Sequence, residues 1–145
     1  MISHLVTFLL GALTGAAGKY LADKYTDKRR LKEGESRSKK LFQELASRMP
    51  DLIKEMKDDL SKPDNHLIRE FYILPHRRVS FMAGGRRYLY YFEEEHQDLL
   101  HKLHILEEPG FIQDITETNT PKFRMTEQFF GYVLKSKIKS GRVKI

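Results

Sequence analysis

The longest apolar stretch of the chain lies at its amino terminus. Residues 2–18, ISHLVTFLLGALTGAAG, contain no Asp, Glu, Lys or Arg. Seventeen helical residues span about 26 Å, and extension to Ala22, with the Lys19 ammonium reaching the headgroups, suffices for a hydrocarbon core of about 30 Å. The pattern therefore predicts a single transmembrane helix over residues 1–22.

Positive charge follows this stretch rather than preceding it, at Lys19, Lys24, Lys28, Arg29 and Arg30. This order predicts a single-pass protein of the inner (cytoplasmic) membrane, of bacterial type, with its carboxyl-terminal domain in the cytoplasm. A cleaved secretory signal and a buried helix are the alternatives, although a signal carries its positive charge before the apolar run. The expected partners are the lipid bilayer and anionic lipid headgroups, which these five basic residues would contact.

Two further features belong to this end of the chain. Gly11 and Gly15 have the spacing that lets two membrane helices approach closely, which predicts a homodimer through the membrane helix. Residues 23–37 are highly charged and are interpreted as a basic juxtamembrane stalk or as a solvated linker.

The rest of the chain alternates between helical and strand periodicities. Pro50 favours a helix start, Gly84-Gly85 between two apolar runs favours a hairpin, and Pro109-Gly110 ends a strongly periodic helix. The predicted class is α+β, with a domain over residues 38–135 and a basic tail over 136–145. The expected elements are helices over 38–49 and 50–60, a strand over 66–74, a hairpin over 77–92, a helix over 92–108, a hairpin over 110–126 and a short helix after 127.

Charge is distributed unevenly along the chain. Residues 1–40 carry nine Lys or Arg against four acids (+5), residues 41–127 carry twelve against sixteen (−4), and residues 128–145 carry five against none (+5). The net charge of +6 therefore lies at the two ends, and the body is mildly acidic. The chain has no cysteine, which excludes disulfides, thiol nucleophiles and cysteine metal ligands.

Arginines and tyrosines interleave in the first predicted hairpin, which makes it the best candidate in the body for an anionic ligand. Such a pattern can clamp single-stranded nucleic acid, but it also forms an ordinary sheet with a charged outer face, and the latter is favoured. The second hairpin adds two cations. The full candidate set is Arg77, Arg78, Arg86, Arg87, Lys122 and Arg124.

No catalytic residues, metal ligands or cofactor are predicted. His96, His101 and His104 lie in one predicted helix, but at 100° per residue they do not converge on one ion. The acidic clusters fall on predicted solvent faces, and no spacing selects a carboxylate pair for acid–base catalysis.

The segment from Leu99 to Leu134 resembles the wing-bearing half of bacterial winged-helix domains. The residues that carry the likeness are Leu99, Leu103 and Leu106 on a helix, then GFI at 110–112, a polar tip, and KFRMT leading into EQFFGYVL. The resemblance implies a two-stranded wing followed by a helix that starts at Thr126-Glu127. We expect Phe111, Ile112, Ile115, Phe123 and Met125 to hold this hairpin to the core.

The resemblance also implies that the helix before the wing would face DNA. Its predicted outward residues are Glu94, Glu95, Asp98, Lys102, Glu107 and Glu108. Five carboxylates would repel a phosphate backbone, so the DNA-binding face of the family is not expected to work here.

Three functional hypotheses follow. The first is a membrane-anchored cytoplasmic interaction or regulatory module without catalytic activity, with a protein partner that the sequence does not identify. The second is a membrane-tethered nucleic-acid-binding regulator, and the third is an enzyme of unrecognised type.

Overall fold

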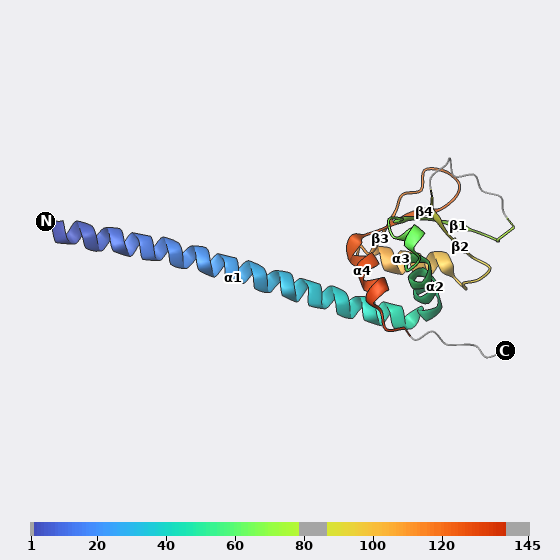
Figure 1. Cartoon of the computed structure of the whole chain (residues 1–145), viewed down its shortest axis with the longest axis horizontal. Coiled ribbons are helices and arrows are strands. Elements are labelled where there is room, and N and C mark those ends of the chain that lie inside the picture. Colours follow the sequence, from blue (N-terminus) through green and yellow to red (C-terminus); the bar gives the residue numbers. More distant parts are fainter. Residues whose placement is uncertain (1, 79–86, 139–145) are drawn as a thin grey trace. The chain divides into compact units, whose positions relative to one another are not determined.

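The structure is a computed structural model that describes the backbone of residues 2–78 and 87–138 and the side chains of residues 14–78 and 87–138. The chain divides into two units, residues 1–40 and residues 41–145, and each is considered by itself. The predicted α+β class is confirmed, since the described residues form α-helices and one four-stranded sheet (Figure 1).

The first unit consists, in its described part, of helix α1 (Ile2–Arg48), which continues into the second unit. No helix in the described part of the chain is long and apolar enough to cross a membrane. The predicted transmembrane anchor, and with it the single-pass placement in the inner membrane, is therefore wrong. In the part of α1 whose side chains are described, charged residues recur from Lys19 onward, which leaves no uncharged run of membrane-spanning length there.

The residues predicted to act at the membrane lie on α1. Gly15 has no neighbouring heavy atom within 4 Å of the place where a Cβ would stand, and Gly11 belongs to the part of α1 whose side chains are not described. The predicted self-association through Gly11 and Gly15 stays a prediction, which neither the structure nor the comparisons test. The five basic residues predicted to contact lipid are all exposed: Lys19, Lys24, Lys28, Arg29 and Arg30.

The second unit begins in the last turns of α1. The elements that follow are α2 (Pro50–Leu60), the 3-10 turn η1 (Pro63–Asn65), β1 (Glu70–Leu74), β2 (Leu89–Phe92), α3 (Leu99–Glu107), β3 (Ile112–Asp114), β4 (Lys122–Met125) and α4 (Glu127–Lys135).

The sheet has the order β2-β1-β4-β3 and is mixed. Strand β1 is parallel to β2, with Phe71 opposite Leu89, and antiparallel to β4, with Phe71 opposite Phe123. The predicted hairpin over 77–92 is thus corrected: its second strand forms β2, but β2 pairs in parallel with the preceding strand β1. Residues 79–86, which include Arg86 and the two glycines, lie outside the described residues.

The second predicted hairpin is confirmed, because β3 and β4 pair antiparallel with Ile112 opposite Met125. The helix predicted after it is also confirmed, since Thr126 caps α4 by accepting a hydrogen bond from the Phe129 N–H at 3.2 Å. Of the five side chains expected to hold the hairpin to the core, Ile115 is only half-buried. The others are buried: Phe111, Ile112, Phe123 and Met125.

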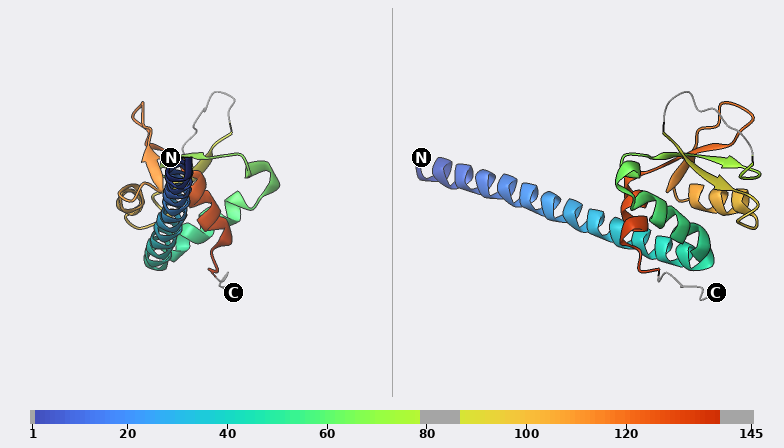
Figure 2. Two further views of the ribbon diagram at one scale, coloured as in Figure 1. Left: turned by 90° about the vertical axis from the view of Figure 1, so that its left-hand side faces the viewer. Right: turned by 45° about the vertical axis from the view of Figure 1, so that its right-hand side comes forward.

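The helices of the second unit lie on one side of the sheet (Figure 2). Alternate strand residues, such as Phe71 and Ile73 of β1, are buried in the core with them. The centre of this core is aromatic, since the Phe42 and Phe129 rings meet edge-on at 5.8 Å and the Phe111 and Phe129 rings stack at 5.8 Å. The strand residues between these buried ones lie on the opposite face of the sheet, and some of the candidate cations are among them.

Helix α3 is shorter than predicted. It begins at Leu99 rather than Phe92, because Asp98 adopts φ 54 at its start and residues 93–98 form turns and a bend. One acid of this segment, Glu95, forms an ion pair with Arg77. The helix ends before Gly110, whose φ of +79 suits glycine and whose N–H donates to the Glu107 carbonyl at 2.8 Å.

Candidate interaction surface along strand β2

Two neighbouring hollows of about 420 and 430 Å³ lie beside β2 and share Asn65, Tyr88 and Tyr90 in their walls. We call them together the β2 groove. Among the described strands β2 lies at one end of the sheet and pairs with β1 alone, so the groove lies at a sheet edge. The described residues that line it are Glu55, Asp59, Lys62, Asp64, Asn65, Ile68, Arg77, Arg87, Tyr88, Leu89, Tyr90 and Phe92.

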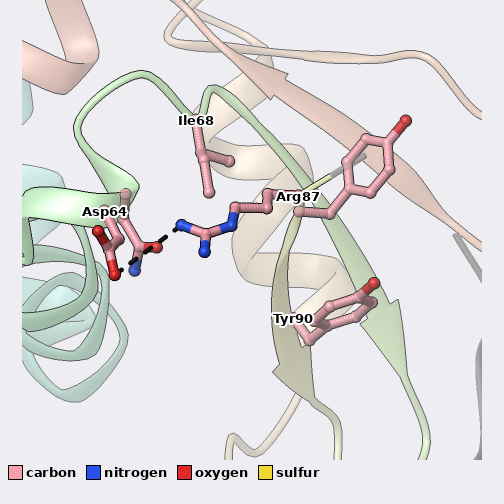
Figure 3. Close-up of a pocket in the computed structure, with 6 residues that line it drawn as sticks. Asp64, Ile68, Arg87 and Tyr90 are labelled. Carbon is pink, nitrogen blue, oxygen red and sulfur yellow. Dashed lines mark ion pairs between the residues drawn. The ribbon is translucent and has the colours of Figure 1, made fainter. Parts of the chain in front are cut away.

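The first hollow is spanned by the side chain of Arg87, which reaches from the start of β2 toward Asp64 of η1 (Figure 3). The Arg87 Nη1 and Asp64 Oδ2 atoms are 3.9 Å apart, and the side chains are 69% and 82% exposed. An ion pair this long and this exposed contributes little, so Arg87 can exchange its partner at small cost. Ile68 and Tyr90 add apolar surface to the same hollow (Figure 3).

The second hollow is lined by residues of α2 and by Arg77, among others. The guanidinium carbon of Arg77 lies 4.9 Å from the centroid of the Phe92 ring. The Arg77 guanidinium also donates to both carboxylate oxygens of Glu95, with its Nη2 at 3.0 Å from Oε2. The other cation of this hollow, Lys62, pairs with Asp59 of α2 at 2.7 Å. Both cations therefore already face carboxylates.

The sheet face next to the groove carries two more candidate cations. Lys122 and Arg124 of β4 both pair with Glu70 of β1, at 2.9 and 2.7 Å. Hydrogen bonds from Lys122 first and Arg124 second hold the pKa of the Glu70 carboxyl below its ordinary value. The Lys122 ammonium also lies 4.8 Å from the Tyr88 ring centroid, so Tyr88 joins this cluster to the groove.

The six predicted anion-binding residues are only partly brought together. Lys122 and Arg124 form one cluster around Glu70, whereas Arg77 and Arg87 line different hollows of the groove. These four each face a carboxylate, so the surface carries both signs of charge and is not a basic patch. Of the remaining two, Arg78 is exposed and does not line the groove, and Arg86 is outside the described residues.

Sequence reasoning missed the acids that accompany these cations. Glu70 alternates with buried Phe71 in β1, and this alternation alone could have placed it on the same sheet face as Tyr72. Asp64 and Glu55 could not be assigned in this way, because they reach the groove from η1 and α2, which lie far from β2 in the sequence.

A buried polar cluster lies between α2 and the segment around β2. His96 is 6% exposed, and its Nε2 contacts the Glu55 carboxylate. The Tyr91 hydroxyl is buried and has no hydrogen-bond partner among the described residues. Burial raises the pKa of Tyr91 well above its ordinary value, and the Asp59 and Glu55 carboxylates add to this effect.

The other two histidines considered as metal ligands lie in different surroundings from His96. His101 is exposed on α3, and His104 faces Glu107 at 3.3 Å.

Comparison with protein-family models, curated proteins and solved structures finds no match to this chain. The winged-helix resemblance thus stays a prediction, which the order of α3, β3, β4 and α4 supports.

Proposed function

We propose that the second unit is a protein-binding module whose recognition surface is the β2 groove. The observation that supports this proposal is a tyrosine-lined groove, with charges of both signs, beside the terminal strand of the described sheet. A strand at the edge of a sheet is a template for an added extended segment, which gains affinity from backbone hydrogen bonds and specificity from side-chain pockets.

The chemistry of the groove fits a protein better than a polyanion. Tyrosine and arginine are enriched in protein interfaces and at their hot spots, and both are present here. A nucleic-acid backbone would meet Glu55, Asp59 and Asp64 in the same groove, and their negative charge would repel its phosphates. A polypeptide can place opposite charges against both signs.

Site-specific photocrosslinking of the full chain in cells tests this function. A photoreactive phenylalanine at Tyr88 reports on the groove, and the same residue at His101, exposed on α3 outside the groove, is the matched control. We expect discrete protein adducts from position 88 that position 101 does not give. Identical patterns from both positions, or no protein adduct from position 88, would refute the proposal.

A second candidate function is the binding of single-stranded nucleic acid on the sheet face. The specific observation in its favour is the Lys122 ammonium, which lies 5.4 Å from the Tyr72 ring centroid and 4.8 Å from that of Tyr88, with Arg124 on the same strand. Aromatic rings next to cations can stack bases and hold phosphates. In the crosslinking experiment, adducts at position 88 that nuclease removes would favour this candidate over a protein partner.

A further inference from the structure

The sequence around β2 has opposite charges at its two ends. Arg87 precedes the strand, Leu89–Phe92, and Glu93, Glu94 and Glu95 follow it. A strand with this pattern is complementary to itself when two copies run antiparallel, because the basic end of each then meets the acidic end of the other. A twofold axis makes both contacts at once.

One antiparallel register matches both the charges and the apolar residues. Centred on residue 90, it places Arg87 opposite Glu93 of the second copy, Tyr88 opposite Phe92, and Leu89 opposite Tyr91. Directly opposite residues of an antiparallel pair project to the same face of the sheet. The burial pattern agrees, since Leu89 and Tyr91 are both buried, whereas Tyr88 and Phe92 are both half-buried.

The backbone of β2 is oriented for the same register. The Glu93 N–H donates to the Leu74 carbonyl of β1 at 2.9 Å, so the odd-numbered residues of β2 direct their backbone groups to β1. The alternation ends there, because the Glu94 N–H donates to the Pro75 carbonyl at 3.3 Å as the chain leaves the strand. Because this direction alternates along a strand, Tyr88 and Phe92 direct theirs to the sheet edge. The Phe92 carbonyl also accepts from the Glu95 N–H at 3.1 Å and keeps a second lone pair for a partner strand. The register places these two residues opposite one another, as a hydrogen-bonded pair of an antiparallel ladder requires.

The charged residues of this register are also available. Arg87 has only the long, exposed contact with Asp64 within the described ranges, and Glu93 forms no ion pair with any described residue. Glu94 and Glu95 are instead engaged by Arg77. The acid that remains for a second copy is therefore Glu93, the residue that the register places opposite Arg87.

We propose that the protein self-associates through β2, whose edge pairs antiparallel with the β2 edge of a second copy and joins two sheets across a twofold axis. This inference rests on the proposed function of the groove and identifies its occupant as another copy of this chain. Arg87 and Glu93 set the register through two symmetric ion pairs.

Charge reversal in the full chain tests the register. Sedimentation velocity over a concentration series should show a monomer–dimer equilibrium for the wild type. Arg87→Glu alone, or Glu93→Arg alone, should weaken dimerisation about tenfold, because each creates two like-charged cross-strand pairs. The double variant should restore it, since both pairs re-form with their signs exchanged. Arg78→Glu carries the same charge change outside the groove and should leave the dimer intact.

Two results would overturn the inference. One is a chain that stays monomeric at every concentration. The other is a dimer that Arg87→Glu leaves unchanged or that the double variant does not restore, because its contact must then lie elsewhere. The photoprobe at position 88 separates this failure from that of the proposed function. Adducts with other proteins but not with a second copy would refute self-association alone, and the absence of any protein adduct would refute both.

Discussion

Replacing Tyr91 with phenylalanine is expected to stabilise the second unit. The Tyr91 ring is fully buried and packs edge-on against Phe71 at a centroid distance of 5.3 Å, a contact that phenylalanine retains. The hydroxyl has no hydrogen-bond partner among the described residues. A buried polar group without a partner costs about 1–3 kcal/mol, and removing its oxygen leaves a small void, so we expect a net gain of about 1 kcal/mol.

The same substitution should change the dependence of stability on alkaline pH. The pKa of Tyr91 is raised in the folded protein by burial first and by Asp59 and Glu55 next. Above the ordinary tyrosine pKa of about 10, the unfolded chain loses this proton while the folded chain keeps it, so stability falls with rising pH by about 1.4 kcal/mol per unit. Below that pH this contribution is constant. The gain in the free energy of unfolding from Tyr91→Phe should therefore be constant from about pH 7 to 9 and should increase above about pH 10.

Urea unfolding followed by circular dichroism at several pH values measures both effects. The matched control is Tyr88→Phe, because Tyr88 is only half-buried and its substitution should change stability by less than about 0.5 kcal/mol. If Tyr91→Phe lowers the free energy of unfolding by about 1 kcal/mol or more, the reasoning is refuted. Such a result would mean that the Tyr91 hydroxyl makes a hydrogen bond, for example to a buried water molecule. An unchanged alkaline slope would refute the raised pKa.

Three further predictions concern single positions. Gly110→Ala should cost about 1 kcal/mol in urea unfolding, because φ of +79 strains any residue with a Cβ although the space is open; a neutral result would contradict this. Thr126→Ala should cost about 1–2 kcal/mol, since Thr126 accepts from Phe129 and donates to the Phe111 carbonyl at 3.0 Å, and Thr126→Ser should recover most of it. Glu70→Gln should lower stability at neutral pH by less than about 1 kcal/mol, because the ion pairs lie near solvent. The pKa of Glu70 is lowered in the folded state, so the difference in stability between Glu70→Gln and the wild type should vanish as the pH falls through this lowered pKa. A difference that persists in acid would contradict the lowered pKa of Glu70.

Several elements follow from local sequence alone. Pro50 begins α2, Thr126 caps α4 and Gly110 allows the chain to leave α3, because each acts through its own backbone or through neighbours within a few residues. The hairpin of β3 and β4 is local as well, since its strands are joined by a short polar loop. These predictions are confirmed because no distant contact is needed to decide them.

Other predictions failed where distant contacts compete with local preference. Glu94 and Glu95 favour the first turn of a helix, yet in the structure they contact Arg77, and α3 starts only at Leu99. The predicted membrane helix is a different failure, since no helix in the described part of the chain is long and apolar enough to cross a membrane.

The sequence by itself determined the α+β class and the helix boundaries at Pro50 and Gly110, because these depend on composition and neighbouring residues. Only the tertiary structure decided that β2 lies parallel to β1 at the end of the sheet, and that Glu55 and Asp64 share a groove with Arg77 and Arg87. Strand order and charge pairing join residues far apart in the chain, and such contacts are selected by the packing of the whole core, which no local pattern encodes.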